Sequence, residues 1–204
     1  MGINKFIVIE GLDGSGKSTV TQLLKQRFEV AGQPCHATFE PTNNPIGQLI
    51  RKMLSGDIPM ENETAALLFA ADRYEHLTKE IIPTLEHSHV VCDRYYYSNM
   101  AYQGLDLDTL QRVIYYNQAA MKILKPDAVF FLDISPVECM RRVTARGNKA
   151  SIYETLPELE LRHSRFMEAH TQLPGNIIKI GNDSDTLQEI VQKIWSICDE
   201  LFCS

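Results

Sequence analysis

The stretch KFIVIEGLDGSGKST, residues 5–19, decides the fold prediction. Its first part is an apolar run typical of a strand, and its second part matches G-x-x-x-x-G-K-[ST], the pattern of a phosphate-binding loop. The loop lies between this predicted strand and a helix predicted over 17–31, which is the context that the motif requires. Its glycines let the backbone curl so that the amides point towards an anion. The stretch therefore predicts a nucleoside triphosphate site.

The loop supplies most of the predicted ATP contacts. Lys17 would reach the β- and γ-phosphates, and the Ser18 hydroxyl would bind Mg²⁺. Asp13 is a carboxylate among phosphates and needs a metal or a substrate hydroxyl as its partner; a turn residue that bonds its own backbone is the alternative. The predicted ATP-binding residues of the loop are Gly11, Leu12, Asp13, Gly14, Ser15, Gly16, Lys17, Ser18 and Thr19.

Apolar runs alternate with amphipathic segments along the whole chain. Strands are predicted over 5–10, 34–40, 89–93, 128–133 and 176–181, and helices over 17–31, 62–82, 107–124, 135–145, 155–171 and 184–202. Continuous apolar runs are typical of parallel strands covered on both faces. The alternation predicts a single α/β domain over 1–204, with a five-stranded parallel sheet and helices on both faces. Substrates of such sheets bind beyond the carboxyl ends of the strands.

Composition limits the class of partner. The chain has 204 residues, of which 44% are hydrophobic and 23% charged, so a folded domain with a sizeable core is expected. The formal net charge of −6 argues against a nucleic-acid partner, which would require excess Lys and Arg. No membrane span or N-terminal signal is visible. Because the five cysteines form no C-x-x-C pair, we expect reduced thiols and a cytoplasmic location.

A second motif, CDRYYYSNMAYQG at 92–104, follows the third predicted strand. Asp93 ends the apolar run, where the metal-associated acid of a phosphate-loop protein belongs. The planar guanidinium of Arg94 suits a phosphoryl group held by two hydrogen bonds; a local ion pair that caps the strand is the alternative.

A third motif, LFAADR, lies in the helix predicted over 62–82. Phe69 and Arg73 are four residues apart, so they share one helix face and could address one ligand. A stacking ring and a hydrogen-bonding fork together suit a nucleobase. Taken alone, however, the pair would be interpreted as a core phenylalanine and an arginine paired with an acid.

Together these motifs resemble the bacterial thymidylate kinases. FIVIEGLDGSGKST, EPTNNPIG, LFAADRYEH and DRYYYSNMAYQG occur in the family's order, and the resemblance spans at least residues 5–160. The family comprises P-loop kinases that transfer the γ-phosphoryl group of ATP, bound with Mg²⁺, to dTMP. The resemblance therefore implies an ATP:dTMP phosphotransferase of pyrimidine deoxynucleotide biosynthesis, and a homodimer packed through helices.

Two alternatives differ in the second substrate. The same motifs would serve a deoxynucleoside kinase, or a nucleoside monophosphate kinase with a different base preference. A nucleotide-operated switch without an acceptor is disfavoured, because the sequence has no N-K-x-D guanine signature and the AADR and AYQG motifs would have no purpose.

The resemblance also implies roles for individual residues. Phe69 resembles the aromatic residue that stacks on thymine, and Arg73 the arginine that donates to a thymine carbonyl. Tyr102 resembles the tyrosine beside C2′ that disfavours a ribose hydroxyl, and Asp13 the carboxylate near the 3′-hydroxyl. The other groups implied around the base, the sugar and the acceptor phosphate are Asn99, Arg51, Arg94 and Gln103.

Positive charge on the moving phosphoryl group is expected from a lid. Some thymidylate kinases carry a basic residue in the loop at the position of Gly14; this sequence resembles those that supply it from a lid, here RRVTARGNKASIYE at 141–154. Arg146 is the predicted lid cation, and Arg142 could stack on adenine; a solvated basic helix end is the alternative. The loop GNDS at 181–184 is a second candidate adenine contact. The predicted catalytic residues are thus Lys17, Arg94, Arg146 and Asp13.

The sequence departs from the family pattern at two places. The lid pattern R-G-x-x-D-R-x-E is altered, since Ala150 and Ser151 replace the acid and the second arginine, while Lys149 could replace the missing charge. Phe39 stands where many members have arginine before Glu-Pro. Lysine is a point charge and not a fork, so the sequence predicts a clamp on the phosphates that is either weaker or differently shaped.

Overall fold

The computed structural model describes residues 4–147, 151–172, 177–181 and 183–203. Five parallel strands form one sheet in the order β2-β3-β1-β4-β5. Their bounds are β1 (Phe6–Gly11), β2 (Cys35–Phe39), β3 (His89–Asp93), β4 (Ala128–Leu132) and β5 (Ile177–Ile180). The predicted five-stranded parallel sheet is therefore confirmed, and each strand begins and ends within one residue of its predicted bounds.

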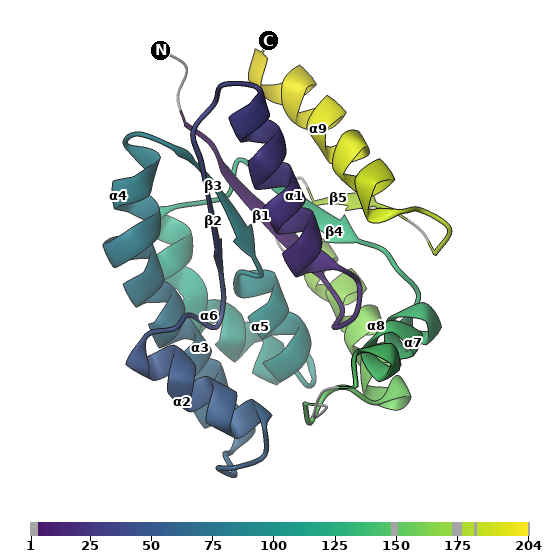
Figure 1. The fold of residues 1–204 in the computed structure, drawn as a ribbon. Helices are drawn as coiled ribbons and strands as arrows, with labels where there is room; N and C mark the ends of the chain where they lie inside the picture. The colour runs from purple at the N-terminus through teal and green to yellow at the C-terminus, as the bar shows by residue number, and fades with distance from the viewer. Residues whose placement is uncertain (1–3, 148–150, 173–176, 182, 204) are drawn as a thin grey trace.

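The central strands form the core because they carry no polar face. Every residue of β1 and β4 is buried, as expected for strands covered by helices on both sides. Figure 1 shows α1 (Lys17–Val30) and α9 (Leu187–Cys203) side by side on one face of the sheet. The opposite face is covered by α3 (Asn62–His76), α5 (Tyr96–Gln103), α6 (Leu107–Ile123) and α8 (Leu156–Gln172).

Two helices lie beyond the carboxyl ends of the strands. These are α2 (Pro45–Leu54), after β2, and α7 (Pro136–Arg146), after β4 (Figure 1). They flank the edge of the sheet where the phosphate-binding loop follows β1. The fold thus gathers the sequence motifs at one edge, as expected for a parallel α/β sheet.

One predicted helix is divided in the structure, and two helices were not predicted. The helix predicted over 62–82 is α3 followed by a π-helical segment, η1 (Leu77–Ile81), and by α4 (Ile82–Leu85). Pro83 lacks the amide hydrogen that a regular α-helix needs there, which is consistent with the altered hydrogen bonding before it. Neither α2 nor α5 was predicted. All eight residues of α5 are buried, so it lacks the polar face by which amphipathic helices are recognised.

No helix within the described residues is both long and apolar enough to cross a membrane.

Candidate active site

The phosphate-binding loop joins β1 to α1, and α7 packs directly on it. Gly14 and Gly16 have left-handed backbones, with φ of +87° and +97°, which side chains disfavour. A Cβ on Gly14 would collide with the carbonyl oxygen of Cys139 in α7. The glycine at this position is therefore needed both for the backbone turn and for the close approach of α7.

A cavity opens on this loop and is lined by residues from four parts of the chain. They are Asp13, Gly14, Gly16, Lys17, Ser18, Thr19, Asp93, Arg94, Arg142, Arg146, Asp185, Thr186 and Leu187. Gly11, Leu12 and Ser15, predicted to bind ATP, belong to the loop but not to the cavity lining. Lys17 is buried and its Nζ donates to the Leu12 carbonyl at 2.7 Å. Burial, and then the charge of Arg94, lower the pKa of Lys17.

The predicted Mg²⁺ residues lie together at the end of β3. The Ser18 hydroxyl donates to Asp93 Oδ2 at 2.5 Å, while Asp93 Oδ1 is buried without a hydrogen-bond partner. A buried carboxylate oxygen that lacks a donor calls for a cation or an unseen donor. Hydroxyl and carboxylate oxygens are ligands that Mg²⁺ accepts, so these two residues fit the metal.

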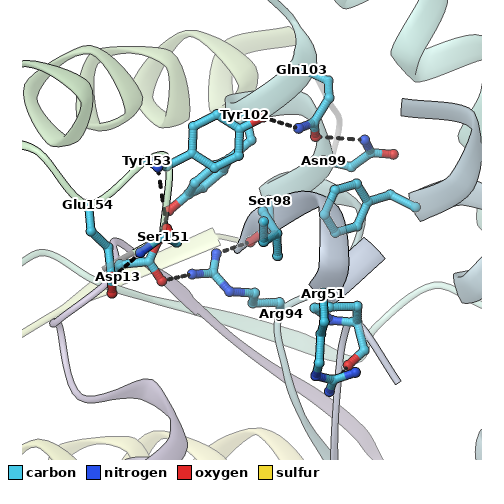
Figure 2. Close-up of a pocket in the computed structure, with 13 residues that line it drawn as sticks. Asp13, Arg51, Arg94, Ser98, Asn99, Tyr102, Gln103, Ser151, Tyr153 and Glu154 are labelled. Atoms are coloured by element: carbon cyan, nitrogen blue, oxygen red, sulfur yellow. Dashed lines mark hydrogen bonds and ion pairs between the residues drawn. The ribbon is translucent and has the colours of Figure 1, made fainter. Parts of the chain in front are cut away.

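A second cavity lies beside the first, between α2, α3, α5 and residues 151–154, and Figure 2 shows the residues around it. Its lining residues are Asp13, Pro41, Arg51, Leu54, Phe69, Arg94, Ser98, Asn99, Tyr102, Gln103, Ser151, Tyr153 and Glu154. The structure thus brings together all but one of the residues predicted to bind the acceptor. An aromatic ring and amides suit a nucleobase, and arginines suit the phosphate of a nucleotide, so the cavity as a whole suits a nucleotide.

The two cavities share two lining residues, Asp13 and Arg94. Arg94 NH2 donates to Asp13 Oδ1 at 2.5 Å, and the Tyr102 hydroxyl donates to Asp13 Oδ2 at 2.9 Å (Figure 2). Burial opposes ionisation of Asp13, but the charges of Arg94 and Lys17 outweigh it and hold the pKa of its carboxyl below the ordinary value. The boundary between the cavities therefore carries a fixed negative and a fixed positive charge.

Arg73 was predicted to bind the acceptor but does not line this cavity. It is 1% exposed, and its NH2 donates to Glu40 Oε2 at 2.6 Å. Its NH1 donates to Asn117 Oδ1 at 2.5 Å and to Asn99 Oδ1 at 3.4 Å. The ion pair with Glu40, directly after β2, draws the guanidinium behind Asn99. The two residues of the LFAADR motif therefore differ: Phe69 faces the cavity, and Arg73 supports its wall.

Comparison with known proteins agrees with this geometry. The family model for thymidylate kinase matches residues 9–194 of the chain. The chain belongs to the thymidylate kinase family. It is 41% identical to a probable thymidylate kinase of Methanococcus aeolicus, with 94% of each chain covered. It is 39% identical to one of Thermococcus gammatolerans, with 98% of this chain and 97% of that one covered. A thymidylate kinase of Leptospira borgpetersenii is 36% identical, with 97% and 92% covered.

In this thymidylate kinase family member, described residues of the predicted lid line both cavities. Arg146 lines the loop cavity and pairs with Glu154, which lines the second cavity, at 2.7 Å. Arg142 also lines the loop cavity, and its Nε donates to Glu138 Oε1 at 2.6 Å. The predictions for Lys149 and Ala150, and the Asn182 position of the GNDS loop, lie outside the described residues.

The two departures from the family pattern occupy defined places. Ser151 lines the second cavity, and its backbone amide donates to Glu154 Oε2 at 2.7 Å. Phe39 is partly exposed, and the guanidinium of Arg51 lies over its ring at 5.6 Å. Arg51 donates to the carbonyls of Pro41 and Thr42. Phe39 therefore gives Arg51 a stacking surface where an arginine would repel it.

Several cavity residues were missed by the sequence analysis. Ser98, Tyr153 and Glu154 line the second cavity, and Asp185, Thr186 and Leu187 line the loop cavity. Ser98 lies one residue before the predicted Asn99, so its proximity to the DRYYYSN motif was the available signal. Tyr153 and Glu154 fell inside the predicted lid, but only its basic residues were considered.

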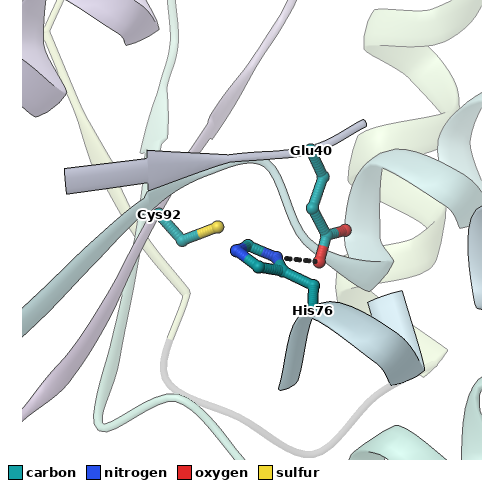
Figure 3. Close-up of side chains that lie close together, drawn as sticks. All are labelled: Glu40, His76 and Cys92. Atoms are coloured by element: carbon teal, nitrogen blue, oxygen red, sulfur yellow. Dashed lines mark hydrogen bonds and ion pairs between the residues drawn. The ribbon is translucent and has the colours of Figure 1, made fainter. Parts of the chain in front are cut away.

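A separate cluster of potential metal ligands lies behind the sheet edge. Figure 3 shows Glu40, His76 and Cys92, whose ligand atoms lie within 4.8 Å of one another. Hydrogen bonds to Glu40 and Glu80 outweigh burial and raise the pKa of His76 to about 9, while burial raises the pKa of the Cys92 thiol well above its ordinary value. Metals bind neutral imidazole and thiolate, which these environments disfavour. The cluster is therefore a hydrogen-bonded core.

Proposed function

We propose that this protein transfers the γ-phosphoryl group of ATP to dTMP and so forms dTDP. The observation that carries the proposal is the shared boundary of the two cavities, where Asp13 and Arg94 line both. A donor in the loop cavity and an acceptor in the second cavity would meet there. The names of the archaeal and bacterial relatives support dTMP as the acceptor.

The donor side uses the loop residues. Lys17 is the candidate contact to the β- and γ-phosphates, with the loop amides and the N-terminus of α1 as further anion donors. Ser18 and Asp93 are the residues that would hold Mg²⁺. When bound, the ion neutralises phosphate charge during transfer. Two arginines of the predicted lid (residues 141–154), Arg142 and Arg146, line the same cavity, and Arg146 is the candidate cation for the moving group.

The acceptor side uses the second cavity. Phe69 offers a ring for stacking on the base, and Asn99 and Gln103 offer amides. Tyr102 lies against the sugar position in this proposal, where its ring leaves no room for a 2′-hydroxyl. Arg51 and Arg94 are the candidate ligands of the acceptor phosphate. Because a nucleoside monophosphate is already an anion at pH 7, positioning and electrostatics would supply most of the acceleration.

The experiment is an acceptor panel of dTMP, dUMP, dGMP, dCMP and thymidine, each with ATP and Mg²⁺. We expect dTMP to give the highest kcat/KM, with formation of dTDP and ADP in equal amounts. A protein that phosphorylates thymidine and leaves dTMP unchanged would contradict the proposal. Preference for another monophosphate would retain the reaction class and change the base.

We also propose that the protein forms a homodimer through the outer face of α3 and α6. Large apolar side chains are exposed on these helices, among them Leu67, Tyr74 and Tyr115 at 48%, 46% and 66%. A groove lined by residues of the two helices, Leu67, Ala70, Ala71, Tyr74, Tyr115, Tyr116, Gln118, Ala119, Ala120 and Lys122, runs between them. An apolar patch around a groove of small residues fits a second helical surface of the same kind.

A further inference from the structure

Glu10 is a buried acid to which the proposed reaction assigns no role. It lies in β1, one residue before the loop begins, and is 1% exposed. Its Oε1 accepts from the Tyr95 amide at 2.8 Å and from the Ser98 amide at 3.2 Å. Its Oε2 accepts from the Ser98 hydroxyl at 2.6 Å. Glu10 therefore ties the start of α5 to the central strand.

The Ser98 hydroxyl connects this carboxylate to the boundary of the two cavities. It donates to Glu10, and it accepts from Arg94 NH1 at 2.9 Å, as Figure 2 shows. The other terminal nitrogen of Arg94 donates to Asp13. The guanidinium is therefore held at both ends, by Asp13 directly and by Glu10 through one hydroxyl.

The backbone of Arg94 is held by the same strand. Arg94 has a left-handed backbone, with a φ of +73°. Among the residues that the structure describes, the others with such a backbone are glycines. Such a conformation costs on the order of 1 kcal/mol or more and persists where neighbouring contacts enforce it. Its amide donates to the Ile9 carbonyl at 2.9 Å, and the next amide, that of Tyr95, donates to Glu10. Both ends of the strained residue are thus fixed to β1.

We propose that Glu10 and Ser98 are positioning residues that hold the Arg94 guanidinium where the donor and acceptor cavities meet. The inference rests on the proposed function, in which Arg94 contacts the phosphates. A displacement of about 1 Å in such a group is enough to slow transfer by about a hundredfold. Because the Ser98 hydroxyl contacts both Arg94 and Glu10, we expect its removal to slow phosphoryl transfer markedly, although it is a small group.

A role for Glu10 in capping α5 alone does not account for these contacts. The bonds to the two amides would satisfy a neutral glutamine oxygen equally well. Burial raises the pKa of Glu10 to about 7, so keeping an ionisable carboxyl there costs stability. The carboxylate gains its additional contact, the Ser98 hydroxyl, on the side facing Arg94, and Ser98 lines the acceptor cavity.

The first test compares Ser98→Ala with Tyr97→Phe. Each removes one buried hydroxyl from α5, but the Tyr97 hydroxyl contacts Tyr96 and lies outside both cavities. We expect Ser98→Ala to raise the KM for dTMP about tenfold and to lower kcat by a similar factor, with the KM for ATP within twofold of wild type. Tyr97→Phe should keep wild-type kinetics. Equal kinetics in both variants, with both folded by thermal unfolding, would overturn the proposal.

A double-mutant cycle separates positioning from general destabilisation. If Ser98 acts through Arg94, Ser98→Ala should weaken dTMP binding about tenfold in the wild type and leave it unchanged in an Arg94→Gln background, as calorimetry would measure. Glu10→Gln should resemble Ser98→Ala in both backgrounds. Equal losses of affinity in the two backgrounds would contradict the proposed link.

A measurement without substrate keeps the inference distinct from the proposed function. The guanidinium nitrogens of a held arginine give separate ¹⁵N NMR signals, which merge when the group rotates freely. We expect separate signals for Arg94, assigned by their loss in Arg94→Lys, and merged signals in Ser98→Ala. Unchanged signals in Ser98→Ala would refute positioning. If the wild-type protein does not phosphorylate dTMP, only the proposed acceptor is refuted.

Discussion

At the scale of single residues, Gly14 limits which side chains can bring positive charge to the loop cavity. Its left-handed backbone and the Cys139 carbonyl beside it leave no space for a side chain. The loop of this protein therefore cannot accept the basic residue that some thymidylate kinases carry there. The arginines that line the loop cavity come instead from the position directly after β3 and from α7: Arg94, Arg142 and Arg146.

Gly14→Ala should accordingly weaken both folding and ATP binding. The new Cβ adds a collision with α7 to the cost of the backbone conformation, so we expect a loss of unfolding free energy of roughly 2 kcal/mol or more. Gly32→Ala is the matched control, because Gly32 also has a left-handed backbone but a Cβ added there would meet no atom within 4 Å. It should lose only about 1 kcal/mol and keep wild-type ATP affinity. Thermal unfolding and nucleotide titration measure both, and equal losses would contradict the collision.

The position of Arg73 leads to a second residue-scale prediction. Arg73→Ala would leave Glu40 buried with His76 as its remaining cation, so we expect a loss of up to about 3–5 kcal/mol of stability, the cost of breaking a buried ion pair. It would also release Asn99 and Asn117, so the KM for dTMP should rise. The double variant Glu40→Gln with Arg73→Met should recover most of the stability but keep the raised KM. If stability and KM recover together, Arg73 is structural alone; denaturant titration and steady-state kinetics distinguish the outcomes.

At the scale of elements, the strands could be predicted and two helices near the site could not. β1, β3 and β4 are continuous apolar runs between loops, so their bounds follow from hydrophobicity. By contrast, α5 is buried on all sides and has a mixed composition, so no periodicity marks it. Asn99, Tyr102 and Gln103 were still predicted as site residues, because they belong to a sequence motif. A motif depends on the identity of its residues and not on hydrophobic periodicity.

The candidate site divides in the same way. Many residues that line a cavity lie in the recognised motifs, with Asp185, Thr186 and Leu187 as exceptions, but the residues that hold them in place depend on tertiary contacts. Glu10 reaches Ser98 across 88 positions, and Asn117 reaches Arg73 across 44. No local sequence pattern encodes such pairs. These supporting contacts could therefore be identified only from the structure.

The junction of α3 with η1 carries a pH-dependent contribution to stability. The raised pKa of His76, about 9, means that the folded state favours the protonated ring between Glu40 and Glu80. Its contribution is complete below the unfolded pKa near 6.5 and is lost as the pH rises through about 9. We expect the unfolding free energy to fall over this window by on the order of 3 kcal/mol.

Urea titrations between about pH 6 and pH 10 measure this effect across the window that linkage defines. His76→Gln should remove most of the decrease, whatever its stability at the acidic end, because glutamine does not titrate. The exposed His87 offers a control, and His87→Gln should keep the wild-type dependence. A decrease of equal size in His76→Gln would assign the effect to other groups.

At the scale of the whole molecule, the two faces of the sheet are covered differently. On the face that carries α1 and α9, the exposed apolar side chains are isolated; Val30, at 82% exposure, is an example. On the face that carries α3 and α6, several exposed aromatic and aliphatic side chains surround a groove between the two helices. From sequence, the apolar residues of the second face could not be separated from the core, since both follow the same helical spacing.

The proposed homodimer is therefore tested by placing charge on this face. Leu67→Glu and Tyr115→Glu each put a carboxylate where a partner's apolar surface would lie, so either change should convert the dimer to a monomer. Val30→Glu adds the same charge at a more exposed site on the opposite face and should leave the dimer intact. Sedimentation equilibrium gives the mass of each variant. Because neither Leu67 nor Tyr115 lines the cavities that bind substrate in the proposed function, loss of dTMP phosphorylation in the monomers would mean that the dimer supports α3 and, through it, Phe69. A wild type that sediments as a monomer would refute the dimer itself.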